Sequence, residues 1–233
     1  LGLGCHSVSQ EYWIYQIHLQ TYSEQTMNPL NEVFDKIFVL SIPVLSDRIK
    51  NMTERLGGIE YEFFFGTYGG DLDVTPYRKA GSKLTRGQLS CALNHYKIYQ
   101  KIVDDDIRNA LILEDDCIFN QNILNIESYA NQLPEDYSVF YLGFQEESAG
   151  SHYSENLNIL TGRGVGHTHA MNVKQSCAEM MLEFNKDLIW TADGAFNELA
   201  KKYDVSYYLA NPKIAGQDNG GGEDSTLVFV DKI

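Results

Sequence analysis

The sequence predicts one α/β domain, with a mixed, mostly parallel sheet flanked by helices. Short apolar runs typical of buried strands alternate with longer segments in which apolar residues recur at helical spacing. The 233 residues exceed the ~100 to 200 of a typical domain but suit a single α/β core with excursions. Apolar residues make up 43% of the chain and charged residues 21%, a balance that argues against intrinsic disorder and coiled coils.

We interpret residues 1–34 as an N-terminal extension and residues 35–233 as the single domain. From Trp13 to Leu19, large apolar side chains fall at every second position, which predicts an added strand. Asn28-Pro29 then gives the turn signal that closes the segment. The composition of this segment indicates no chemistry.

The domain is expected to open with a strand at 36–42, a nearly continuous apolar run of the kind that is buried on both faces of a parallel sheet. A helix follows over 45–56, because its apolar residues recur at spacings of four, three and four before a glycine pair. Residues 61–65 predict a second strand. The stretch 66–73, rich in glycine and aspartate, predicts a loop.

The next helix, over 85–102, is the best signalled element. Thr85 and Gln88 form a capping box at its start, and apolar residues line one face. Three aspartates at 104–106 end it, and a buried strand at 110–113 follows. This strand delivers three carboxylates at its carboxyl end, Glu114, Asp115 and Asp116. Ligands of open α/β sheets bind outside the carboxyl ends of the strands, so we expect the site there.

The rest of the chain continues the alternation. The expected elements are a strand at 138–142, a glycine-rich loop at 162–166 leading into 167–171, helices at 173–184 and 190–202, a strand at 205–209 and a mobile polar tail from 216 to 222. No internal repeat or domain linker interrupts this order.

Charge excludes one class of partner. The chain has 32 acidic and 18 basic residues, a formal net charge of −14, so its surface should repel the phosphate backbone of DNA or RNA. We expect no nucleic-acid partner.

The apparent compartment is the cytoplasm. No run approaches the ~20 apolar residues of a membrane span, and the first residues lack the features of a signal peptide. The four cysteines contain no C-x-x-C pair, which disfavours zinc ribbons and disulfide scaffolds and favours a reducing compartment. We therefore expect a cytoplasmic protein, with peripheral membrane association as a variant. The chain begins with Leu1 rather than Met, which leaves a secretory compartment open.

The carboxylate triplet is the sharpest chemical signal. Three adjacent carboxylates repel one another and desolvate badly unless a cation is present. Mg²⁺ and Mn²⁺ take oxygen ligands, usually one or two carboxylates together with substrate phosphates. Taken alone, the triplet is compatible with a divalent metal and, as the commoner case, with a solvated acidic strand end.

Five other polar residues each allow two interpretations. Asp193 opens a helix, where a carboxylate is favoured electrostatically, and a role as catalytic base would require it to face an acceptor. Arg48 can reach a phosphate or pair with a surface acid. His95 can point towards the strand end or satisfy nearby carbonyls. His167 and His169, two positions apart, share one face of a strand, either as ligands or hydrogen-bond donors or as histidines satisfied by the backbone.

Several blocks occur in the order found in one enzyme family. Residues 39–42 with Arg48 are similar to an opening V-I-N-L strand followed by an arginine, with serine in place of asparagine. Residues 84–95 are similar to L-T-x-G-E-I-G-C-A-L-S-H, with a glutamine and an asparagine as departures. Residues 110–116 read A-L-I-L-E-D-D, letter for letter.

Later blocks keep the order. Residues 141–143 are similar to Y-L-G and residues 168–171 to T-H-A-Y, with methionine in place of tyrosine. Asp193 falls at a P-x-D position without the proline, and Gln217 falls in the closing region. Together the blocks resemble family 25 glycosyltransferases, the group of lipooligosaccharide sugar transferases and procollagen galactosyltransferases.

The resemblance implies a GT-A type nucleotide-sugar transferase fold with a D-x-D-like motif that holds a divalent cation, Mn²⁺ or Mg²⁺, against the donor diphosphate. Carried over to this chain, the expected metal ligands are Glu114, Asp115 and Asp116, of which the first two also contact the donor. Further binding residues are expected at Ser41, Arg48, Thr85, Gln88, His95, His169 and Gln217. Asp193 is the expected catalytic base, with Glu223 and Asp224 behind it.

The expected function is therefore metal-dependent transfer of a hexose, galactose or glucose, from a UDP-sugar to a hydroxyl of a glycan or a hydroxylated side chain, with inversion. A cation neutralises the charge on departing UDP, and a carboxylate deprotonates the attacking hydroxyl. Two alternatives are a glycan-binding domain of the same fold without turnover, suggested by the replaced motif residues, and a nucleotide-diphosphate hydrolase. The sequence makes no prediction about oligomeric state.

Overall fold

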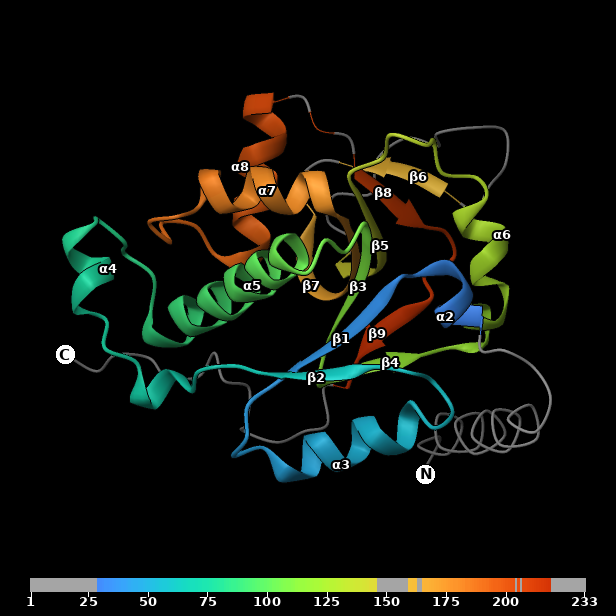
Figure 1. Ribbon diagram of the computed structural model, residues 1–233, viewed down its shortest axis with the longest axis horizontal. Helices are drawn as coiled ribbons and strands as arrows, with labels where there is room; N and C mark the ends of the chain where they lie inside the picture. Colours follow the sequence, from blue (N-terminus) through green and yellow to red (C-terminus); the bar gives the residue numbers. More distant parts are fainter. Residues whose placement is uncertain (1–28, 146–158, 163–164, 204, 206, 219–233) are drawn as a thin grey trace, which may run out of the picture.

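Among the residues that the computed structural model describes, which are 29–145, 159–162, 165–203, 205 and 207–218, seven strands form one sheet (Figure 1). In spatial order they are β2 (Glu62–Phe65), β1 (Lys36–Ser41), β3 (Asn109–Glu114), β7 (Gly166–Lys174), β5 (Val139–Gln145), β8 (Tyr207–Ala210) and β6 (Ile159–Gly162). The first three are mutually parallel, β7 is antiparallel to β3 and β5, β8 is parallel to β5, and β6 is antiparallel to β8. Only β7 and β6 of these strands are reversed, which confirms the mixed, mostly parallel sheet.

Helices cover both faces of this sheet (Figure 1). On one face lie α5 (Arg86–Asp104), α7 (Gln175–Phe184) and α8 (Ala192–Tyr203), whose apolar residues share a buried core with Phe38 and Ile112. On the other face, apolar residues of α2 (Pro29–Val33), α3 (Ser46–Arg55) and α6 (Ile126–Ala130) form a second core with Val39 and Leu111. Successive residues of β1 and β3 thus alternate between two cores, as the period of a strand requires.

The capping box at the start of α5 is confirmed. The Thr85 side chain accepts a hydrogen bond from the Gln88 backbone N–H (3.2 Å), and Gln88 Oε1 accepts one from the Thr85 N–H (3.0 Å). These two bonds satisfy donors that a helix start otherwise leaves unpaired. They fix where α5 begins and hence which of its side chains face the carboxyl end of β3.

Short elements complete the architecture. They are the 3-10 turns at Gly69–Asp71 and Gln121–Asn125, α4 (Thr75–Lys79), and a small sheet in which β4 (Cys117–Phe119) pairs antiparallel with β9 (Ala215–Gln217). The register sets Cys117 opposite Gln217. Because Cys117 directly follows the acidic triplet, this pairing brings the end of the described chain to the site.

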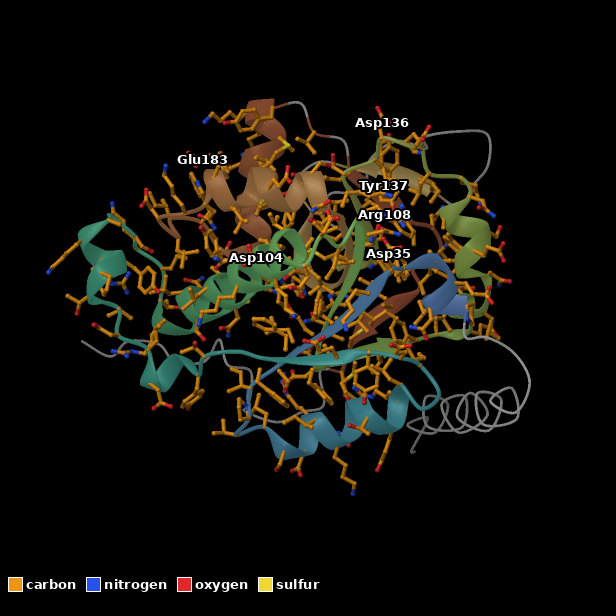
Figure 2. The ribbon with its side chains drawn as sticks, in the orientation of Figure 1. Asp35, Asp104, Arg108, Asp136, Tyr137 and Glu183 are labelled. Atoms are coloured by element: carbon orange, nitrogen blue, oxygen red, sulfur yellow. The ribbon has the colours of Figure 1, made fainter. Side chains whose placement is uncertain are left out.

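A buried polar cluster forms hydrogen bonds between strands at the amino end of β3, the end away from the carboxylates. Asn172 is fully buried, accepts a hydrogen bond from Tyr137 Oη (2.6 Å), and donates to Asn109 Oδ1 (2.6 Å) and the Ala110 carbonyl (2.9 Å). Figure 2 shows Tyr137 close to Arg108 in this region. The cluster satisfies polar groups that burial alone would penalise.

Three boundaries differ from the sequence expectation. Val173, expected in a helix, pairs with Ala110 and Val139 in β7, because the strand continues to Lys174 before α7 begins. Gln217, expected in a mobile tail, lies in β9. Residues 29–33, assigned to the extension, form α2, and Leu30 is buried in the core. The strand expected around 13–19 and the rest of the tail from residue 219 lie outside the described residues.

The described helices include none with both the length and the apolar character that crossing a membrane requires.

Candidate functional site

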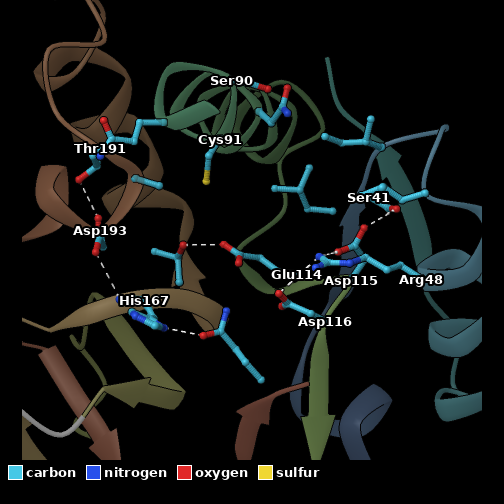
Figure 3. A pocket seen from close by; sticks show the side chains of 18 residues that line it. Ser41, Arg48, Ser90, Cys91, Glu114, Asp115, Asp116, His167, Thr191 and Asp193 are labelled. Atoms are coloured by element: carbon cyan, nitrogen blue, oxygen red, sulfur yellow. Dashed lines mark hydrogen bonds and ion pairs between the residues drawn. The ribbon is translucent and has the colours of Figure 1, made fainter. Parts of the chain in front are cut away.

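A cavity of about 500 Å³ opens at the carboxyl ends of β1 and β3 (Figure 3). Its walls come from the start of α3, one face of α5, the start of β7, the start of α8 and the end of β9. Segments that are far apart in the sequence thus meet where an α/β sheet ordinarily binds its ligand. The triplet Glu114, Asp115 and Asp116 lies on this wall, as expected.

Asp115 is held by residues from the first strand and helix. Ser41 Oγ donates to Asp115 Oδ2 (2.7 Å), and Arg48 Nη1 donates to Asp115 Oδ1 (2.8 Å). Asp115 and Ser41 are both buried. Each oxygen of Asp115 therefore already accepts a hydrogen bond, and the carboxylate fixes the Arg48 guanidinium at the cavity wall.

Glu114 is held from the other side. His95 Nε2 lies 3.0 Å from Glu114 Oε1, and Thr168 Oγ1 donates to the same oxygen (2.7 Å). Burial opposes ionisation of Glu114, but the hydrogen bond and the charge of His95, followed by the Thr168 hydroxyl, outweigh burial and lower the Glu114 pKa to about 2. This carboxylate is ionised throughout the physiological range.

Asp116 is the least satisfied of the three carboxylates. Its Oδ1 is buried without a hydrogen-bond partner in the part of the chain that the structure describes, while Oδ2 lies 3.4 Å from Arg48 Nη1. Burial and then the negative charge of Glu114 raise the Asp116 pKa to about 6, against the opposing effect of Arg48. A cation beside Asp116 would oppose both effects by stabilising the ionised carboxylate.

The opposite wall is built around Asp193 at the start of α8. Asp193 Oδ1 accepts hydrogen bonds from Thr191 Oγ1 (2.7 Å) and the Gly194 N–H (2.8 Å), and Oδ2 accepts a longer one from the His167 N–H (3.4 Å). The helix start stabilises its negative charge electrostatically. Asp193 lines the cavity, the position that a catalytic base needs.

His167 links this wall to β9. Its backbone has φ of 69°, a left-handed conformation that is uncommon for a residue other than glycine. In that conformation its N–H reaches Asp193, its ring Nδ1 hydrogen-bonds Gln217 Oε1, and the exposed ring lines the cavity (Figure 3). The strained backbone is thus held by contacts from two other elements.

His169 lies behind the wall rather than on it. It is buried, and burial lowers its pKa to about 4, so the ring is neutral at pH 7. Its Nε2 lies over Gly143, where a Cβ would come within 2.2 Å of that atom and 2.7 Å of the Ala215 carbonyl. Only a glycine at position 143 leaves room for this imidazole next to β9.

Residues 34–192 match the family described as "Glycosyltransferase family 25 (LPS biosynthesis protein)". The chain belongs to glycosyltransferase family 25. The α/β architecture agrees with the GT-A type fold expected for this family.

Curated relatives are longer proteins. "Procollagen galactosyltransferase 1" from Danio rerio is 26% identical over 129 residues, which is 47% of this chain and 21% of the relative. "Probable inactive glycosyltransferase 25 family member 3" from Bos taurus is 29% identical over 144 residues, which is 52% of this chain and 24% of the relative. The chain therefore spans only a small part of the length of these relatives.

A solved structure with a similar outline is that of "a glycosyltransferase involved in the glycosylation of the major capsid of PBCV-1". It is 10% identical, the match covers 79% of this chain and 92% of that one, and the TM-score is 0.46.

The cavity wall includes most of the residues expected from the sequence. Those on the cavity wall are Ser41, Arg48, Gln88, Glu114, Asp115, Asp116, Asp193 and Gln217. Thr85 caps α5 instead, and His95 is buried behind Glu114. Glu223 and Asp224 lie outside the described residues.

The sequence allows His167 as a ligand or hydrogen-bond donor but does not place it among the expected binding residues. Sequence reasoning missed five other polar side chains of the wall: Ser90, Cys91, Asn94, Thr168 and Thr191. A helical projection would have found Cys91, because positions 88, 91 and 95 lie on one face of α5. Nothing in the sequence signals that His167 rather than His169 faces the cavity, since the left-handed turn at His167 breaks the strand alternation.

Proposed function

We propose that this family 25 member is an active, metal-dependent glycosyltransferase. It transfers a hexose, galactose or glucose, from a UDP-sugar to a hydroxyl of a glycan or a hydroxylated side chain, with inversion. The observation that carries the proposal is that Asp116 Oδ1 is buried, has no hydrogen-bond partner among the described residues, and lies at a cavity large enough for a sugar nucleotide.

The residues fit a divalent cation such as Mn²⁺ or Mg²⁺. Hard cations prefer carboxylate oxygens, and Asp116 together with Glu114 presents them on one wall. Asp115 acts from behind by fixing Arg48. When bound, the cation supplies Lewis-acid stabilisation of the departing diphosphate.

The protein's own groups account for donor orientation. Arg48 places a guanidinium at the carboxyl end of β1, where its planar donors suit phosphate oxygens. Because Ser41 and Arg48 both bind Asp115, the arginine is preorganised before a donor arrives. Preorganised charge is more effective in a cavity shielded from water than at an open surface.

Asp193 acts as the base in this proposal. Its Oδ1 is held by two short hydrogen bonds, whereas Oδ2 accepts the longer one of 3.4 Å from the His167 N–H. An acceptor hydroxyl that displaces this weaker contact would donate to Oδ2, and its proton would move there as the oxygen attacks the anomeric carbon. His167 then positions the base through its backbone.

The test is a panel of UDP-sugars with Mn²⁺, read by mass spectrometry for released UDP and for glycosylated acceptor. Asp116→Ala should lower turnover on the order of 100-fold, while Asp136→Ala, an exposed acid remote from the cavity, should leave it unchanged. Full turnover and unchanged Mn²⁺ dependence in Asp116→Ala would refute the metal assignment.

A glycan-binding domain without turnover is the second candidate, because one relative carries "probable inactive" in its name. The residues that replace family motif positions nevertheless make specific contacts. Ser41 bonds to Asp115, Gln88 caps α5, and Asn94 accepts from the Thr67 N–H (2.8 Å). Calorimetry separates the candidates, since UDP binding that requires Mn²⁺ favours the enzyme and glycan binding without UDP affinity favours the alternative. Product analysis with and without acceptor tests the hydrolase.

We also propose a cytoplasmic location, as the cysteine spacing indicates, with peripheral membrane association as a variant. Asn51 of the sequon Asn51-Met52-Thr53 is exposed on α3. Mass spectrometry of the native protein tests the location, because an N-linked glycan on Asn51 would place the chain in the secretory pathway.

A further inference from the structure

Three side chains of different chemical kinds meet at the cavity beside Asp115 and Asp116, two of them on its wall and one, His95, buried behind Glu114. They are Cys91, His95 and Glu114, and one thiol sulfur, one imidazole nitrogen and one carboxylate oxygen lie within 4.8 Å of one another. Figure 3 shows the sulfur of Cys91 pointing into the cavity. Cys91 is a free thiol. The role proposed above uses Glu114 but leaves the sulfur without a function.

The fold places these groups for simple reasons. Cys91 and His95 are four residues apart on α5, so they lie on the same helical face. Glu114 is the last residue of β3, and His95 Nε2 lies 3.0 Å from Glu114 Oε1. Two ligand atoms of a tetrahedral zinc site, each about 2.0 to 2.1 Å from the metal, lie roughly 3.3 Å apart. The separation of His95 and Glu114 therefore needs only a small adjustment, and the Cys91 sulfur, which lies within 4.8 Å of a ligand atom of each, would move closer on binding.

The fourth coordination position of such a tetrahedral site would remain accessible. Cys91 and Glu114 both line the cavity, so a water molecule or a ligand oxygen can approach from that side. Thr168 Oγ1 also lies 3.4 Å from His95 Nε2. Three protein ligands with one open position are typical of exchangeable or catalytic zinc sites rather than closed structural ones.

We propose that Cys91, His95 and Glu114 bind a thiophilic divalent cation such as Zn²⁺, at a position adjacent to the carboxylates that serve Mn²⁺ or Mg²⁺. Thiolate and imidazole select Zn²⁺ and Co²⁺, whereas carboxylates and water suit Mg²⁺ and Mn²⁺. The two kinds of metal thus divide between neighbouring positions according to ligand chemistry. Because Glu114 serves both, loading of the thiol site antagonises Mn²⁺-dependent donor binding, a consequence that rests on the proposed function.

The site should load reversibly. Histidine ligands of tight zinc sites usually donate the second ring N–H to a carboxylate or carbonyl. His95 Nδ1 is buried and has no hydrogen-bond partner among the described residues. Without that support the imidazole is a weaker ligand, so we expect EDTA to remove the metal from the folded protein.

The first test titrates the full chain with Co²⁺ alone and records the thiolate-to-cobalt charge-transfer absorption. Wild type should show this band with one cobalt per chain. Cys91→Ser should abolish the band, and His95→Gln should weaken binding at least tenfold. Cys177→Ala, a buried thiol on α7 that faces the core, should keep it. A band that survives in Cys91→Ser, or no band in wild type, overturns the proposal.

A second test needs no substitution and so does not depend on the folding of variants. Wild type is alkylated with iodoacetamide in the presence of Zn²⁺ or Mg²⁺, and peptide mass spectrometry reads the modification of Cys91. Zn²⁺ should slow alkylation of Cys91 at least tenfold, and EDTA should reverse the protection. Equal rates in the two metals overturn the proposal.

Antagonism is measured separately by calorimetry of UDP binding with Mn²⁺, with and without one equivalent of Zn²⁺. Zn²⁺ should weaken UDP binding at least tenfold in wild type and have less than a twofold effect in Cys91→Ser. Unchanged binding in wild type overturns the antagonism. A chain that binds Co²⁺ through Cys91 yet never binds UDP contradicts the proposed transferase function and leaves the thiol site standing.

Discussion

Asp116→Asn should make the metal-free protein more stable, although the same change removes a proposed metal ligand. Folding raises the Asp116 pKa from 3.8 to about 6, so the folded state binds this proton more tightly than the unfolded state. The stability linked to the proton is fully present below pH 3.8 and is lost as the pH rises through about 6. A shift of about 2 units corresponds to about 3 kcal/mol at pH 8.

Asparagine lacks the charge and should recover most of that free energy. For a chain of this length, each kcal/mol moves Tm by about 2 to 4 °C, so thermal unfolding in EDTA at pH 8 should show a rise of roughly 5 to 10 °C. At pH 4.5 the difference should fall to about 1 kcal/mol, because folded wild type is then protonated while most of the unfolded chain is still ionised at Asp116. With Mn²⁺ the order should reverse, since only wild type gains binding free energy.

Asp136→Asn is the matched control, because Asp136 is exposed and remote from the cavity. Its Tm should follow wild type at both pH values and respond equally to Mn²⁺. If Asp116→Asn is no more stable than wild type in EDTA at pH 8, or if its advantage is undiminished at pH 4.5, the account of the carboxylate triplet is wrong.

Substitutions at three further positions test other parts of the structure. Glycine and asparagine both tolerate the left-handed backbone at position 167. If His167 acts by presenting its N–H to Asp193, His167→Gly and His167→Asn should each keep kcat within about threefold of wild type. A loss of kcat on the order of 100-fold in both variants would show that the ring acts directly. Gly143→Ala should lower stability by about 1 to 3 kcal/mol in urea unfolding, because its Cβ would press on His169 and β9; an unchanged midpoint would contradict the close approach. Asn172→Ala should lower stability by about 2 to 3 kcal/mol, because it leaves buried polar groups without hydrogen-bond partners. KM for the donor should not change, since these groups lie far from the cavity. A shifted KM would show that the two ends of β3 are coupled.

Local patterns were sufficient to predict most of the fold. The strands at β1 and β3 follow from continuous apolar runs, and the capping box fixed the start of α5 because its two bonds join residues three apart. The carboxylate triplet could be placed at the site because the ends of parallel strands meet at one edge of a sheet.

Features that depend on distant partners could not be predicted in this way. β9 is three residues long and is a strand only because β4, about a hundred positions earlier, pairs with it. His167 faces the cavity because contacts from Asp193 and Gln217 hold a left-handed backbone that local preference disfavours. Val173 carries an apolar side chain that suits either a strand or a helix, and the register with β3 decides for the strand.

The pairing of β9 with β4 affects the order in which the sheet and the site form during synthesis. When residue 210 has left the ribosome, every strand of the large sheet has been made, and the carboxylate triplet and Asp193 are already present. Gln217, which bonds to the His167 ring, and the Asp218 N–H, which donates to the Asp116 carbonyl (2.7 Å), are still missing. A nascent chain can therefore complete its large sheet before its site, and these contacts form only after residues 217 and 218 have emerged.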